Sequence, residues 1–119
     1  MDKKAPTQTA KLTRLYNLLQ ICARAGQLKT GYDSVSKMIG QRRARLVLLA
    51  EDFSERNKQR IMRICEEAGV PVFILGTMAE YSCQFSQRAT GIIMTPDRNF
   101  ARGLLKIISG DNEQANLEV

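Results

Sequence analysis

The sequence predicts an α/β fold in which helices cover both faces of a small sheet, an α/β/α sandwich with three or four strands that are mostly parallel or mixed. Short, continuous apolar runs alternate along the chain with segments whose apolar residues recur every three or four positions. The chain has 119 residues, 44% of them hydrophobic, which fits one core. We therefore expect one domain over residues 10–108, between a flexible leader at 1–9 and a frayed tail at 109–119.

Each element is indicated by its own pattern. Apolar residues at i, i+3 and i+4 indicate helices, and continuous apolar runs indicate buried strands. Gly26 and Gly69 are placed to end helices, whereas Ser54 and Asp97 are placed to begin them. In chain order we expect a helix from residue 10 to Gly26, an extended piece at 27–30, a helix at 32–42, a buried strand at 46–50, a helix from Ser54 to Gly69, a second buried strand at 70–75, a short helix at 77–85, a strand at 90–95 and a final helix opened by Pro96 and Asp97.

The charge balance favours a polyanionic partner. The chain has 18 Lys and Arg against 12 Asp and Glu, for a formal net charge of +6. Clustered cations gain free energy by releasing counterions when they bind nucleic acid or an acidic membrane. No apolar run approaches the roughly 20 residues of a spanning helix, and the N-terminal segment lacks the apolar region of a secretory signal. We expect a cytoplasmic protein, and a monomer because no large apolar helix face is left over.

The residues that usually carry catalysis or bind metals are sparse. The three cysteines are far apart and there is no histidine, so neither a zinc site nor a disulfide framework is expected. Cys22 and Cys65 sit at apolar helical positions and are predicted to be core thiols. Nucleophile-elbow, phosphate-loop and dinucleotide motifs do not occur. Carboxylates that follow strands, Glu51-Asp52 and Asp97, leave a small enzyme as an alternative, but we expect no enzyme, no cofactor and no metal.

The segment around Gly31 is the first candidate binding site. Gly31 lets the backbone turn sharply before a helix whose start presents unpaired N–H groups and the positive end of its dipole. Asp33 and Lys37 then lie one turn apart on the solvent face, where they suit base amino groups and phosphates. An ordinary capped helix with an Asp–Lys surface pair is the plainer interpretation. The candidates in this segment are Lys29, Gly31, Asp33, Ser34, Lys37 and Gln41.

Two further segments carry basic residues. Arg42, Arg43 and Arg45 lie between a helix and a strand, where they either complement the helix dipole or form a phosphate-binding patch. The loop before the last strand mixes a base, an amide and small residues, as is typical of loops that contact unstacked nucleotides. The candidates in this loop are Gln87, Arg88, Ala89 and Thr90.

Four local strings, in this order and spacing, carry a family resemblance over roughly Leu12 to Ile108. They are Gly31-x-Asp33-x-x-x-Lys37, Ala44 to Asp52, Cys65 to Val72 and Asn99-Phe100-Ala101. Together they resemble the kink-turn-binding ribosomal protein family of L-seven-Ae and L-thirty-e, and within it the bacterial YlxQ-like branch. The resemblance implies a three-layer α/β/α sandwich with a mixed four-stranded sheet. It also implies an RNA-binding protein of the ribosomal type that is associated with translation.

The resemblance further implies how RNA is recognised. The helix after Gly31 would enter a kinked RNA at tandem G·A pairs, with Asp33, Ser34 and Lys37 at the positions of the family's base-reading Asn, Glu and Lys. The loop at 87–90 would contact a flipped-out nucleotide, and Lys29 with the three arginines would hold phosphates at the same end of the sandwich. Because ionised Asp accepts hydrogen bonds and cannot donate, the alternative is an adaptor module, for protein interaction or RNA recognition, with this fold but without G·A-specific readout.

Overall fold

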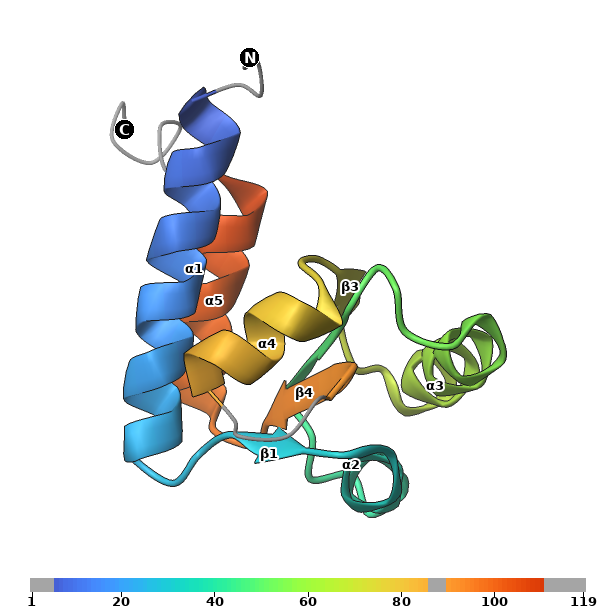
Figure 1. Cartoon of the computed structure of the whole chain (residues 1–119). Coiled ribbons are helices and arrows are strands. Elements are labelled where there is room, and N and C mark those ends of the chain that lie inside the picture. Colours follow the sequence, from blue (N-terminus) through green and yellow to red (C-terminus); the bar gives the residue numbers. More distant parts are fainter. Residues whose placement is uncertain (1–5, 86–89, 111–119) are drawn as a thin grey trace.

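The computed structural model describes residues 6–85 and 90–110, and in them a four-stranded sheet lies between two layers of helices (Figure 1). The strand order is β1-β4-β2-β3, with β4 antiparallel to both β1 and β2 and with β3 parallel to β2. The predicted sandwich with a mixed four-stranded sheet is confirmed. The strands are β1 (Lys29–Thr30), β2 (Leu46–Leu49), β3 (Val72–Ile74) and β4 (Ile92–Thr95).

The helices divide between the two faces of the sheet. Along β2 the buried side chains alternate: Leu46 and Leu48 join the core on the side of α1, α4 and α5, whereas Val47 and Leu49 join the core under α2 and α3. The expectation that this strand is buried on both faces is confirmed. The helices are α1 (Pro6–Arg24), α2 (Tyr32–Gly40), α3 (Glu55–Ala68), α4 (Met78–Phe85) and α5 (Arg98–Ser109).

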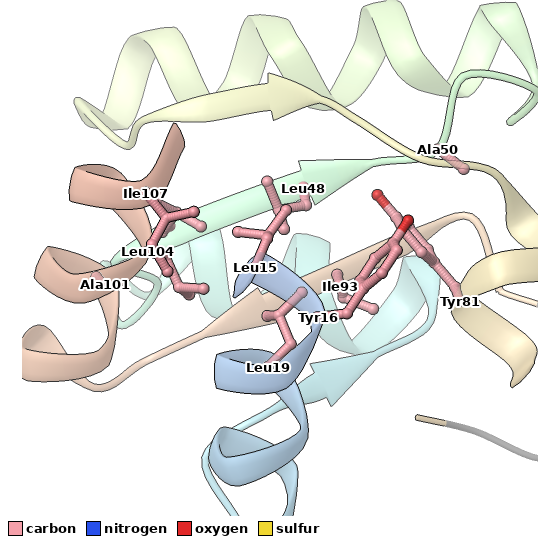
Figure 2. Close-up of a cluster of buried hydrophobic side chains, with 11 residues drawn as sticks. Leu15, Tyr16, Leu19, Leu48, Ala50, Tyr81, Ile93, Ala101, Leu104 and Ile107 are labelled. Atoms are coloured by element: carbon pink, nitrogen blue, oxygen red, sulfur yellow. The ribbon is translucent and has the colours of Figure 1, made fainter. Parts of the chain in front are cut away.

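The larger of the two cores holds α1 and α5 against the sheet (Figure 2). Leu15 of α1, Leu104 of α5 and Ile93 of β4 are almost fully buried there. Each such side chain stabilises the fold by roughly 1.5–3 kcal/mol relative to an exposed position. Tyr81 of α4 is also fully buried, and its hydroxyl donates to the carbonyl oxygen of Leu75, which satisfies the polar end of the ring.

Side chains cap the starts of three helices. Ser54 Oγ accepts from the N–H of Asn57 at 3.3 Å, and Asp97 Oδ1 accepts from the N–H of Phe100 at 2.9 Å, as the sequence predicts. At the start of α4, Asp52 Oδ1 accepts from the N–H of Met78 at 2.9 Å. Two of the carboxylates that left an enzyme as an alternative, Asp52 and Asp97, therefore stabilise helix starts.

Several element bounds differ from the prediction. Helix α1 begins at Pro6, four residues before the expected start, and Ser109 is the last residue of α5 and not part of a tail. Residues 1–5 and 111–119 of the predicted leader and tail lie outside the described residues. The expectation of a second fully buried strand was wrong: β3 is the edge strand, and Ile74 on it is 40% exposed. Cys22 and Cys65 are buried as predicted, whereas Cys83 is exposed.

Candidate nucleic-acid interface

Helix α2 begins at a glycine whose backbone conformation excludes most other residues. Gly31 has φ 96° and ψ 141°, and its carbonyl oxygen accepts the first helical bond, from the N–H of Val35 at 3.0 Å. Its own N–H donates to the carbonyl oxygen of Ile92 at 3.4 Å, which holds the start of α2 beside the start of β4. The start of α2 is thereby fixed at one end of the sheet.

The start of α2 is uncapped, in contrast to α3, α4 and α5. In the part of the chain that the structure describes, no side chain caps this end, because Gly31 has none to offer. No hydrogen bond within that part uses the N–H groups of Tyr32, Asp33 or Ser34. As far as the described residues go, three backbone donors at the positive end of a helix dipole are therefore left for another acceptor.

The solvent face of α2 carries the polar side chains that the periodicity predicts. Asp33, Lys37 and Gln41 follow at i, i+4 and i+8 and are all exposed, and Ser34 is exposed beside them. Val35 and Ile39 are buried against the sheet and fix the rotation of the helix. Neither the Asp33 nor the Lys37 side chain forms an ion pair or hydrogen bond with a described residue, so the surface Asp–Lys pair of the plainer interpretation is not formed.

Only the last residue of the candidate loop before β4 belongs to the described part of the chain. Its residues Gln87, Arg88 and Ala89 lie outside the described residues. Thr90, the fourth candidate, is 8% exposed, and its hydroxyl donates to the carbonyl oxygen of Ile92 at 3.0 Å. Because this hydroxyl is committed to the backbone inside the fold, we leave Thr90 out of the proposed contact surface.

The three arginines lie elsewhere. Arg45 N–H donates to the carbonyl oxygen of Thr95 at 2.9 Å, at the end of β4 opposite to Ile92. Arg42 and Arg43 follow the last turn of α2, a nine-residue helix that is about 13 Å long at 1.5 Å per residue. The expectation that these arginines gather with Asp33 at one end of the sandwich was therefore wrong. Helix α2 runs along the sheet and separates its two ends.

Lys29, the remaining candidate, is exposed on the edge strand β1, where it pairs with Met94. None of the described helices is both long and apolar enough to cross a membrane. The described residues also contain no group of three or more side chains suited to holding a metal ion. The polar surface of α2 is accordingly the feature of this fold that most resembles a binding site.

The fold and this surface define a protein of the L7Ae type. A family model described as the ribosomal protein L7Ae/L30e/S12e/Gadd45 family matches residues 13–81, and the chain belongs to this family. A solved structure of a protein with unknown function from Bacillus halodurans C superposes with a TM-score of 0.76 at 27% identity, covering 80% of this chain and 96% of that one.

Two relatives are named as RNA-binding proteins. The chain is 29% identical over 93 residues to the RNA-binding protein YlxQ of Bacillus subtilis (strain 168), which covers 78% of this chain and 93% of the relative. It is 30% identical over 96 residues to the RNA-binding protein YlxQ of Enterococcus faecium, covering 79% of this chain and 90% of the relative. These matches confirm the family and the YlxQ-like branch that the sequence motifs predict.

The uncapped start of α2 agrees with the unpaired N–H groups that the sequence predicts after Gly31, which stands where Ser, Thr, Asp or Asn begins other helices. The feature that the sequence did not predict is the backbone of Arg42, which has φ 62° in the left-handed region. No local sequence signal predicts an arginine in that conformation.

Proposed function

We propose that this protein binds a bent RNA of the kink-turn type through the start of α2. The observation that carries the proposal is the uncapped helix start, where three backbone N–H groups have no partner within residues 6–85 and 90–110 and lie beside exposed Asp33, Ser34 and Lys37. Family membership and two relatives named as RNA-binding support RNA as the partner. We further propose that the protein acts in the cytoplasm as a non-enzymatic, translation-associated monomer.

Each group has a role that follows from its chemistry. The N–H groups of the first turn donate to base-edge or phosphate oxygens, and the helix dipole favours the negative partner. Lys37, one turn on, supplies a flexible cation that reaches a phosphate or the acceptors of guanine. Asp33 accepts from exposed amino groups of bases, and Ser34 both donates and accepts through one hydroxyl. Lys29 holds a phosphate, and Gln87, Arg88 and Ala89 contact an extruded nucleotide.

Asp33 and Ser34 favour a second candidate function. The family's Asn-Glu pair combines an amide that donates and accepts with a longer carboxylate, whereas ionised Asp33 accepts and does not donate. An RNA-recognition adaptor that binds bent RNA by shape, without G·A-specific readout, is consistent with that difference. The two functions separate in one experiment, because only the first requires the G·A pairs.

Charge reversal on α2 tests the surface. The variant Lys37→Glu is compared with Lys106→Glu, which makes the same charge reversal at another exposed lysine, in the last turn of α5. Binding to a kink-turn RNA is measured by fluorescence anisotropy at near-physiological salt, because low salt lets any basic protein bind. We expect Lys37→Glu to weaken binding at least tenfold and Lys106→Glu to change it less than threefold. Equal effects of the two variants would remove α2 from the interface.

A further inference from the structure

Four arginines gather at the end of the sheet that lies away from the start of α2. Arg45 donates its N–H to the carbonyl oxygen of Thr95, and Arg98 is the first residue of α5, three positions after Thr95. Arg42 and Arg43 lead from the end of α2 into this same corner. All four are exposed, and we call them the arginine corner.

We propose that the arginine corner is a second RNA surface that binds the phosphate backbone of a segment outside the bent element. The inference rests on the proposed function, because it takes RNA as the partner, but it assigns a separate task to a separate end of the molecule. The start of α2 reads the bend, and the arginine corner holds the flanking strand about 13 Å away. Guanidinium groups suit this task because their planar donors match phosphate oxygens.

The charges around the corner support an anionic ligand. In the described part of the chain, no carboxylate lies within ion-pairing distance of Arg42, Arg43, Arg45 or Arg98. Asp97, next to Arg98, accepts from the N–H of Phe100 and keeps its negative charge, which lowers the positive potential beside Arg98. On the α3 side, Glu67 lines a shallow groove together with Arg42, which lowers the positive potential on that flank. Arg43 and Arg45 are therefore the residues on which the test depends.

The backbone of Arg42 supplies an independent observation. Three helices end with the same pair of hydrogen bonds, in which one N–H bonds three residues back and the next N–H bonds five residues back. In α1 and α3 the residue with positive φ is a glycine, Gly26 or Gly69, whereas after α2 it is Arg42. An arginine in a backbone conformation that favours glycine points to a use for its side chain.

The test distinguishes a specific contribution of the arginine corner to RNA binding from the general effect of the protein's net charge. The double variant Arg43→Gln/Arg45→Gln is compared with Arg60→Gln/Arg63→Gln, which removes two exposed arginines from α3. Binding to a kink-turn RNA with a long flanking duplex is measured across a range of salt concentrations. We expect the corner variant to lower the slope of log K against log salt by roughly 1.4–1.8, at 0.7–0.9 per phosphate contact. The α3 variant is expected to leave the slope nearly unchanged.

A second variant guards against loss of folding. Arg42→Gly relieves the strained backbone, so a shallower salt slope in that variant cannot come from instability. A parallel measurement replaces the G·A pairs by Watson–Crick pairs. If the protein bound both RNAs equally while the two double variants still differed in salt slope, bend reading would be refuted and the arginine corner would stand. Equal slopes for the two double variants, or no RNA binding by the wild-type protein, would overturn the arginine corner.

Discussion

The turn after α2 contains a residue that the fold does not favour, and replacing it separates stability from binding. Arg42 has φ 62°, and its N–H donates to the carbonyl oxygen of Ile39 at 3.0 Å while that of Arg43 donates to Met38 at 2.9 Å. The same pattern surrounds Gly69: the N–H of Gly69 donates to the carbonyl oxygen of Glu66, and the N–H of Val70 donates to that of Cys65. The variant Arg42→Gly gives this turn the residue that the equivalent turn of α3 already has.

The size of the effect follows from two opposing contributions. A residue with a Cβ costs about 1–2 kcal/mol in the left-handed region. Replacing that residue by glycine removes this cost, but about 0.4–1 kcal/mol is lost again because glycine has more conformational entropy in the unfolded chain. We therefore expect Arg42→Gly to raise the free energy of unfolding by about 1 kcal/mol, which corresponds to about 4 °C in Tm for a domain of this size.

The matched reverse variant is Gly69→Arg. A Cβ at Gly69 would meet nothing within 4 Å, so backbone strain alone decides its effect, and we expect a loss of about 1 kcal/mol. Urea unfolding measures both variants, with the midpoint expected to shift and the slope m to stay constant. Destabilisation by Arg42→Gly, or no effect of Gly69→Arg, would refute the strain argument and remove one support of the arginine corner.

Four further predictions concern the caps, the glycines and the thiols. Ser54→Ala and Asp97→Ala each remove a helix cap, and we expect each to lower the free energy of unfolding by about 1 kcal/mol, measured in urea. The effects should add in the double variant. A loss in the double variant clearly smaller than about 2 kcal/mol would mean that the caps contribute little. A Cβ at Gly91 overlaps the ring of Phe53, so Gly91→Ala should destabilise the fold by about 1–3 kcal/mol. A Cβ at Gly40 meets open space at a helical position, so Gly40→Ala should stabilise the fold by about 0.5–1 kcal/mol. Equal effects of the two variants on the midpoint of urea unfolding would contradict this packing. Burial raises the pKa of Cys65 to about 11, so this thiol loses its proton at lower pH in the unfolded chain than in the folded one. The free energy of unfolding should therefore fall as the pH rises from 9 to 11. In Cys65→Ala this fall should be less steep. Alkylation of the native protein should modify Cys83 well before Cys22 and Cys65, and equal rates would show that the two buried thiols are accessible.

Sequence reasoning succeeded where the signal is local. Ser54, Gly69 and Asp97 were placed correctly because a cap depends on hydrogen bonds between residues three to five positions apart. The continuous apolar run of β2 also predicted its burial on both faces. The edge position of β3 was missed because strand order depends on contacts between distant segments, and a run such as Val70 to Leu75 has the same composition in the centre or at the edge.

The candidate site shows the same division. The exposed stripe of Asp33, Lys37 and Gln41 follows from helical periodicity alone, and the structure places it as expected. The grouping of Arg42–Arg45 with the start of α2 failed because it ignored the length of the helix between them. The commitment of the Thr90 hydroxyl to the carbonyl oxygen of Ile92 depends on the loop backbone, which composition does not specify.

The most direct test of the central claim is the binding of the wild-type protein to two short RNAs at near-physiological salt. One RNA contains a kink-turn, and the other has its two G·A pairs replaced by Watson–Crick pairs. If the start of α2 reads the bend, the first RNA should bind about a thousandfold more tightly, a difference of about 4 kcal/mol. Equal binding of the two RNAs would contradict kink-turn readout by Asp33, Ser34 and Lys37.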